Sequence, residues 1–201
     1  MAAGQDVALP TALTSNVSVP LSGKVRLELL PSTINSMVAN SGTITTEGGQ
    51  VLMQAAALSD AVASVTHSGR IDTSATQAGA GAVTVLADGG AIKVNGSITA
   101  NSSGQTDCKA NLGGDIVIGR DEETGALAKF TDVSGAKLES DKGFVETSGD
   151  VVSTSGTRVK AGEWLLDPEN LYIRDGSWSG SNYSETNGPK TYTALGANTG
   201  A

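Results

Sequence analysis

Asn40-Ser-Gly-Thr-Ile-Thr45 occurs in closely related form at two further places, and its spacing points to a repeating fold. It returns as Ser68-Gly-Arg-Ile-Asp-Thr73 and as Asn95-Gly-Ser-Ile-Thr-Ala100, with successive glycines 27 residues apart. Looser copies are Ser134-Gly-Ala-Lys-Leu-Glu139 and Ser155-Gly-Thr-Arg-Val-Lys160. In each copy a turn residue and a glycine precede an apolar residue, which is typical of short strands bounded by tight corners.

A second pattern alternates with the first and consists of glycine followed by apolar residues at every other position. Its copies are Gly48-Gly-Gln-Val-Leu-Met53, Gly81-Ala-Val-Thr-Val85, Gly113-Gly-Asp-Ile-Val-Ile118 and Lys142-Gly-Phe-Val-Glu-Thr147. Alternation of this kind would also suit an antiparallel sandwich. However, the two units return about every 20 to 35 residues, as expected when similar coils stack on one another. The sequence therefore predicts an all-β fold, a segment of a right-handed parallel β-helix (β-solenoid).

The same pattern predicts the core and the extent of the coils. We expect coils over residues 1–173, with 1–20 as an irregular leading coil, and a polar tail, loop or incomplete coil over 174–201. Residues 54–66 are rich in Ala and could form a helical turn or two, or else another coil edge. Eight apolar side chains are expected to point inward and form ladders: Ile44, Ile71, Ile98, Val51, Val83, Val85, Ile116 and Ile118.

Composition narrows the classes of function. The formal net charge is −8 and no run of basic residues offsets it, which disfavours binding to nucleic acid or to anionic lipid. No apolar stretch approaches the roughly 18 residues of a membrane span, so we expect no membrane insertion. Only 3% of residues are aromatic, whereas 26 of 201 are Gly. Small residues and turn formers suit many short strands better than a compact globular core.

Two strings near the end of the predicted coils resemble a known family. Gly143-Phe-Val-Glu-Thr-Ser-Gly149 is followed by Gly162-Glu-Trp-Leu-Leu-Asp-Pro-Glu-Asn-Leu-Tyr-Ile173. Both are similar to strings of the filamentous-haemagglutinin-like and high-molecular-weight adhesins, the exoproteins of two-partner secretion. Upstream, residues 38–53 resemble the repeats of the same family, so the resemblance covers about residues 20–173. Lys142 departs from it, standing where a glycine is usual, and so does Leu171-Tyr172, where Val-Thr is commoner.

The resemblance implies a structural and adhesive β-helix segment of a large exoprotein, secreted or held at the bacterial cell surface. Its implied partners are an outer-membrane two-partner-secretion transporter during export, and host cell-surface glycans or proteins. The segment would be an internal piece, following a signal peptide and a secretion domain. Two alternatives stay open: a β-helix enzyme that degrades polysaccharide, and a passive stalk that presents a toxin or a receptor-binding tip.

Candidate nucleophiles, bases and metal ligands are few. His67 has Ser64, Ser68 and Asp72 near it in sequence, but a catalytic triad depends on geometry that such proximity does not establish. We expect His67 to be a solvated residue at a strand end. Cys108 is the single cysteine, so no internal disulfide can form, and one Cys with one His cannot build a structural zinc site. It is expected to be an inert thiol in a loop.

The charged candidates also have plain structural explanations. Asp121-Glu122-Glu123 could offer oxygens to Ca²⁺, but adjacent acids after Arg120 are more typical of a solvated turn. Asp167-Pro168 is expected at a strand edge or corner, because Pro cannot donate to a central ladder, with Trp164 packed as core or cap. Arg174-Asp175 is, with Arg120-Asp121, the clearest adjacent Arg/Asp pair for an enzyme. We predict no catalytic residue, no cofactor and no metal.

Two surface patterns complete the set of candidates. Thr43 and Thr45 could align with Ser97 and Thr99 in an ice-binding array, but Arg70 and Asp72 would interrupt it. Glycosylation sequons, which are plausible in the resembled family, begin at Asn16, Asn95, Asn101 and Asn182.

Overall fold

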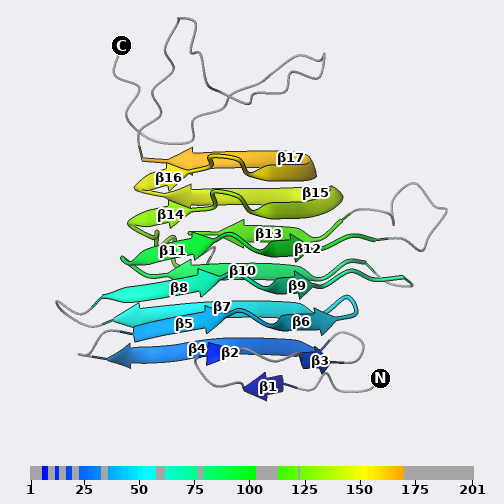
Figure 1. Cartoon of the computed structure of the whole chain (residues 1–201), viewed down its shortest axis with the longest axis horizontal. Coiled ribbons are helices and arrows are strands. Elements are labelled where there is room, and N and C mark those ends of the chain that lie inside the picture. The colour runs from blue at the N-terminus through cyan, green and yellow to red at the C-terminus, as the bar shows by residue number, and fades with distance from the viewer. Residues whose placement is uncertain are drawn as a thin grey trace, which may run out of the picture.

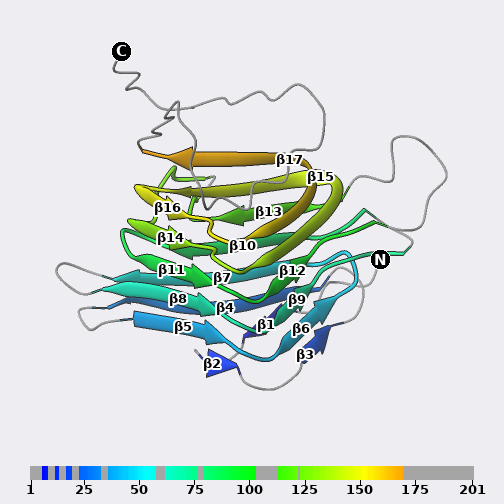
Figure 2. The same cartoon turned by 45° about the horizontal axis from the view of Figure 1, so that its top comes forward.

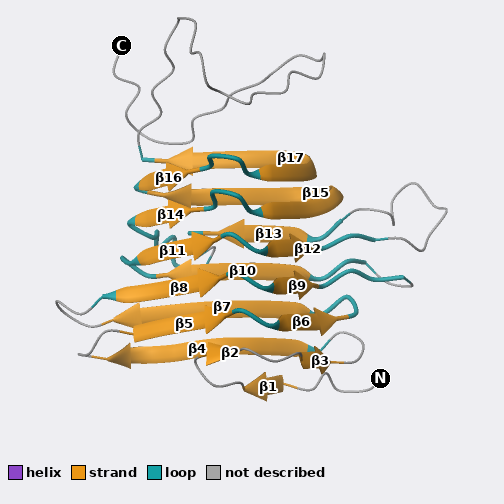
Figure 3. Ribbon diagram, in the orientation of Figure 1, coloured by secondary structure: helices purple, strands orange, loops and turns teal. Residues whose placement is uncertain are grey.

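The computed structural model of the chain is a stack of short parallel β-strands (Figure 1). It describes residues 6–8, 12–13, 17–19, 23–32, 36–57, 62–76, 79–102, 113–121 and 123–169. In this part of the chain the regular structure consists of strands alone (Figure 3). The all-β prediction is therefore confirmed.

Two sheets contain these strands, one with eleven and one with six. The eleven-stranded sheet has two arms, because β15 (Lys137–Gly149) turns a corner in its middle and pairs with strands of both. Next to it, β17 (Arg158–Pro168) follows the same path. The first arm also contains β1 (Asp6–Ala8), β4 (Lys24–Ser32), β7 (Gln50–Ala57), β10 (Ala82–Ala87) and β13 (Asp115–Ile118). The second arm contains β3 (Val17–Val19), β6 (Thr43–Thr46), β9 (Arg70–Asp72) and β12 (Ser97–Thr99).

The six-stranded sheet forms the third side of the stack, as Figure 2 shows. Its strands are β2 (Ala12–Leu13), β5 (Ser36–Asn40), β8 (Ala63–His67), β11 (Ala91–Val94), β14 (Phe130–Asp132) and β16 (Val151–Ser153). The chain visits the first arm, the six-stranded sheet and the second arm in turn. Each named strand pairs in parallel with its counterpart one coil away. This arrangement is consistent with a parallel β-solenoid.

The core is built from ladders of side chains that repeat from coil to coil. Ile44 lies beside Ile71, and Ile71 lies beside Ile98, in the register that the 27-residue repeat predicts. All eight side chains expected to point inward are at most 1% exposed. Burying a Val or Ile side chain contributes about 1.5–3 kcal/mol, so these ladders supply much of the driving force for stacking. The prediction of the core is confirmed.

The segment with two interpretations, residues 54–66, is strand wherever the structure describes it, except at Val62, which immediately precedes β8. Residues 54–57 complete β7 and residues 63–66 lie in β8, whereas residues 58–61 fall outside the described ranges. Ala55 and Ala63 are buried and face the same core as their strand neighbours. The helical alternative is therefore wrong for the described residues, because packing in the ladder outweighs the helix propensity of Ala.

A column of glycines lies at the corner before the first arm. Its members occupy equivalent positions one residue before successive strand pairings: Gly23, Gly49, Gly81, Gly114, Gly143 and Gly162. A Cβ added to Gly81 would overlap the carbonyl oxygen of Gly49, and one added to Gly114 would overlap that of Gly81. Side chains are therefore excluded from this corner by the approach of one coil to the next.

We predict that Gly81→Ala lowers the free energy of unfolding by at least about 2 kcal/mol, because overpacking forces neighbouring backbone to shift. Gly79→Ala is the matched control, since a Cβ at Gly79 has no atom within 4 Å and its backbone lies outside the left-handed region. The control should change stability by less than about 0.5 kcal/mol. Urea unfolding of the two variants measures the difference. Equal stabilities would contradict the packing argument.

Candidate functional site

A shallow groove lies on the outer surface of the first arm, over β4, β7 and β10. Its volume is about 420 Å³, and its floor consists mainly of polar side chains that point away from the core. The lining residues that face outward are Lys24, Arg26, Gln50, Leu52, Gln54, Ala82, Thr84, Leu86, Asp121 and Glu123. Basic residues of β4 lie on one side, and acidic residues of the loop after β13 lie on the other. Amide and hydroxyl groups between them can both donate and accept hydrogen bonds.

The loop after β13 forms one wall of the groove because it folds back over the first arm. Arg120 and Leu127 form an antiparallel bridge across the loop. The Asp121 carboxylate accepts hydrogen bonds from the backbone N–H groups of Glu123 (2.9 Å) and Thr124 (3.3 Å). Leu86 and Val117, which point outward from their strands, are only 2% exposed. Leu86 lines the groove together with Asp121 and Glu123 of this loop.

Asp121 is held ionised in this turn. Burial raises the pKa of its carboxyl, but hydrogen bonds from Glu123 and Thr124 outweigh that effect and leave the pKa below its ordinary value. A carboxylate of this kind is poorly suited to donate a proton at neutral pH. One of its carboxylate oxygens also accepts the backbone hydrogen bonds that close the turn, in agreement with the turn predicted over residues 121–123. Glu122 lies outside the described residues.

A polar cluster fixes the next two coils on the same outer surface. The Arg120 guanidinium lies 3.6 Å from a carboxylate oxygen of Glu146 in β15 and 3.6 Å from one of Asp167 in β17. Ser148 donates a 2.6 Å hydrogen bond to Glu146, which is only 4% exposed. Loop, β15 and β17 are thereby joined through one cation. Sequence reasoning missed this cluster, because it considered Arg120 with Asp121 rather than with acids one and two coils away.

The described parts of the two strings that resemble the adhesin family pair with each other. Phe144–Gly149 in β15 lies in parallel register with Glu163–Pro168 in β17. Trp164 continues the ladder of Val145, and its indole N–H donates a 3.1 Å hydrogen bond to the buried Thr147 hydroxyl. With 37% of its surface exposed, Trp164 lies at the end of the described core as a cap. Pro168 ends β17, as expected for a residue without an N–H group.

Lys142, the departure from the family pattern, has a conformation that favours glycine. Its φ is +58°, which makes it the single non-glycine residue with positive φ in the described part of the chain. It lies at the corner of β15, where the register shifts between Ser140 and Phe144. The backbone at Lys142 is therefore strained, because residues with a Cβ atom disfavour positive φ.

His67 is buried, so the prediction of a solvated histidine is wrong. It ends β8, but the alternation Ala63, Val65, His67 turns its ring into the core, where it is 0% exposed. Asn40 Nδ2 lies 3.1 Å from Nδ1, and the Ser97 carbonyl oxygen lies 3.2 Å from Nε2. These partners assign the proton to Nε2, with Nδ1 accepting from Asn40. The ring therefore bridges three successive coils instead of contacting a serine nucleophile.

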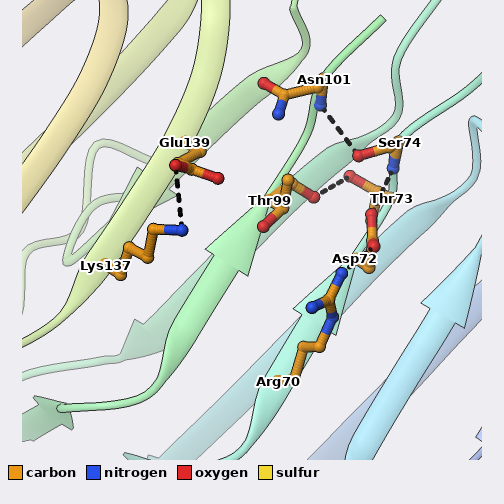
Figure 4. Close-up of polar contacts among 8 residues, drawn as sticks. All are labelled: Arg70, Asp72, Thr73, Ser74, Thr99, Asn101, Lys137 and Glu139. Carbon is orange, nitrogen blue, oxygen red and sulfur yellow. Dashed lines mark hydrogen bonds and ion pairs between the residues drawn. The ribbon is translucent and has the colours of Figure 1, made fainter. Parts of the chain in front are cut away.

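The outer surface of the second arm has charge pairs within single strands. Arg70 and Asp72 form a 2.6 Å ion pair in β9, and Lys137 and Glu139 form a 3.1 Å pair in β15 (Figure 4). Thr43 and Ser97 flank Arg70 in the register. The array of threonines is thus interrupted, as the sequence indicates. A flat ice-binding face is not formed by these strands.

Further candidates are placed as follows. The turn residue Asn95 is exposed, whereas the Asn101 side chain accepts a 2.8 Å hydrogen bond from the N–H of Asp141.

Among the described residues no group of three or more His, Cys, Asp or Glu side chains could hold a metal ion. In the same ranges no helix is long and apolar enough to cross a membrane. Candidates outside the described residues are Cys108, Arg174, Asp175, Asn16, Asn182, Leu171 and Tyr172, together with the predicted tail over 174–201.

No family model matches the sequence, and no curated protein or solved structure matches it either.

We predict that the free energy of unfolding falls as the pH decreases from about 7 to about 5. Burial lowers the pKa of His67 below its ordinary value of 6.5, although its hydrogen bonds act in the opposite direction. The unfolded chain therefore takes up a proton that the folded chain resists. The contribution of the neutral His67 ring to the free energy of unfolding is fully present above about pH 6.5 and is lost progressively below it.

The measurement is urea unfolding over that pH range, with His67→Gln as the comparison. His67 is the single histidine, and the carboxyl pKa values of Asp72, Asp121 and Asp132 are all lowered, so these groups titrate below this window. The His67→Gln variant should be less stable than the parent protein at pH 7, but its free energy of unfolding should not change between about pH 5 and 7. A parent protein with constant stability across the window would contradict the assignment.

A second prediction concerns Lys142. Lys142→Gly should raise the free energy of unfolding by up to about 1 kcal/mol, because glycine adopts positive φ without steric strain. Lys142→Ala removes the same charge but keeps the strain, and it should give no gain. Thermal unfolding compares the two variants. An equal gain in both would assign the effect to charge rather than to the backbone.

Proposed function

We propose that this chain is a segment of a right-handed parallel β-helix from a large secreted bacterial surface exoprotein of the filamentous-haemagglutinin-like class. Its role is structural and adhesive rather than catalytic. The observation that carries this proposal is the pairing of the two family-like strings. Phe144–Gly149 and Glu163–Pro168 lie in adjacent coils and contact each other along their whole length.

Several polar side chains of the paired strings have partners, and two of these contacts join different coils. Thr147 accepts from Trp164, Ser148 donates to Glu146, and Glu146 and Asp167 share Arg120. Such contacts explain why the two strings would occur together, because Trp164 of one hydrogen-bonds to Thr147 of the other, and acids of both share Arg120. The resemblance is thereby supported by a physical role for its residues, rather than by letters alone.

The chain has properties that suit export and display. One cysteine permits no internal disulfide, so an unfolded chain could pass through an outer-membrane two-partner-secretion transporter and fold outside the cell. Stacking then adds stability coil by coil, while the outer surfaces vary without changing the ladders. Host cell-surface glycans or proteins are the proposed partners, and many copies on one cell would strengthen weak individual contacts.

A second candidate, a polysaccharide-degrading enzyme, is favoured by one observation. The groove on the first arm places Asp121 and Glu123 beside amide and hydroxyl groups, an arrangement able to hold a sugar chain. Against it stand the lowered pKa of Asp121 and the burial of His67. A passive stalk is the third candidate and differs from the first only in making no contact with a receptor.

One experiment separates the three. Beads coated with the purified chain are tested for binding to cultured epithelial cells, and the soluble chain is incubated with neutral and acidic polysaccharides. We expect saturable cell binding that soluble chain competes away, without cleavage of any polysaccharide. Beads coated with the heat-unfolded chain are the control.

Cleavage that Asp121→Asn abolishes would overturn the proposal in favour of the enzyme. If the chain neither binds cells nor cleaves polysaccharide, the passive stalk is the candidate that remains. A crystal structure with left-handed or antiparallel connections would overturn the β-helix itself.

A further inference from the structure

Large exposed apolar side chains gather on the outer surface of the six-stranded sheet. Met37 in β5 is 57% exposed, Phe130 in β14 is 41% exposed, and Val151 in β16 is 55% exposed. Val62, which is 54% exposed, immediately precedes β8 of the same sheet. Exposed apolar groups that lie together on one surface are typical of sites of association.

Met37, Phe130 and Val151 belong to one straight column. The parallel register places them in line with two small residues, in the order Met37, Ser64, Ala91, Phe130 and Val151. A second outward column runs beside it, in the order Ala39, Thr66, Lys93, Asp132 and Ser153. The outward side chains of this surface are therefore large and apolar in some coils and small in others. Two neighbouring coils carry one cation, Lys93, and one anion, Asp132.

We propose that this surface binds a second copy of the chain with the two stacks antiparallel. A two-fold axis in the interface, parallel to the strands, keeps each column opposite itself and reverses the order of the coils. With the axis between the β11 and β14 coils, Phe130 of one copy faces Ala91 of the other. Val151 then faces Ser64, so that large side chains meet small ones on both sides of the axis.

Charge complementarity selects the same arrangement. Lys93 of each copy faces Asp132 of the other, which gives two opposite-charge contacts across the axis. A hydrogen bond from the Ser134 side chain lowers the pKa of the Asp132 carboxyl. Burial acts in the opposite direction, but the Ser134 N–H (2.9 Å) and the charge of Lys93 lower the pKa further. The anion is therefore present at neutral pH. The alternative two-fold axis, along the stack, would instead place Lys93 opposite Ala91 and Asp132 opposite Phe130, so that opposite charges would not face each other across the interface.

The area of this surface determines how tightly two copies are expected to associate. Strands of three to five residues in β5, β8, β11, β14 and β16, spaced by about 4.8 Å, give a narrow face. It is smaller than the roughly 800 Å² per partner of a stable complex. Association is consequently weak, and the experiment must extend to high protein concentration.

The test is sedimentation of the full chain over a concentration series that reaches roughly millimolar. We expect a reversible monomer–dimer equilibrium. Phe130→Ser combined with Val151→Ser should weaken it at least about tenfold, because the apolar contacts are lost. Leu52→Ser is the matched control, since Leu52 is an outward apolar residue of the other sheet, and it should leave the equilibrium unchanged.

Charge reversal tests the orientation. Lys93→Asp alone and Asp132→Lys alone should each weaken self-association at least about tenfold, because like charges then face each other twice. A mixture of these two variants should dimerise again, since both contacts become attractive in the mixed dimer. Unfolding curves at low concentration establish that each variant folds.

Two results would overturn the proposal. A chain that stays monomeric over the whole concentration series has no such interface. A dimer that the apolar double variant disrupts, but that the mixed charge variants fail to restore, has another orientation than the antiparallel one.

Discussion

Backbone hydrogen bonds between successive coils are the constraint on which the rest of the structure depends. They fix each strand at about 4.8 Å from its counterpart in the next coil, so equivalent positions must accept equivalent neighbours. Isoleucine stacks on isoleucine at residues 44, 71 and 98. At the corner of the first arm the same closeness leaves room only for glycine, and Gly81 lies directly over Gly49. The core and the corner thus follow from one distance.

This constraint explains which features the sequence could predict. Where the coil length is constant, the period is legible, and the inward ladder of Ile44, Ile71 and Ile98 could be identified from it. Val83 could be identified instead from the alternation of apolar residues within its own strand. Where the length varies, the period disappears. Ala91 pairs with Phe130, 39 positions on, and Phe130 pairs with Val151 only 21 positions later. The outer columns, and the contact of Arg120 with Glu146, therefore could not be predicted without the register.

His67 shows a different limit of sequence reasoning. Histidine is intermediate among residue types in its tendency to be buried, and nothing in its local sequence names Asn40 or the Ser97 carbonyl as partners. Its burial depends on two residues from other coils that satisfy both ring nitrogens. A polar residue at an inward position is acceptable only when the neighbouring coils supply such partners. That information lies in the stacking rather than in the local pattern.

The outer surfaces are where coils with a common core can differ in function. Inward positions are limited by the ladder, but the first arm has a polar groove, the second arm has charge pairs and the six-stranded sheet has an apolar column. The family-like strings belong to the constrained part, because their side chains contact each other across β15 and β17. They therefore bear on the class of fold, and on the proposed mode of export, more directly than on the identity of any ligand. Specificity for a partner would lie instead in the groove or in the apolar column, which the family-like strings do not include.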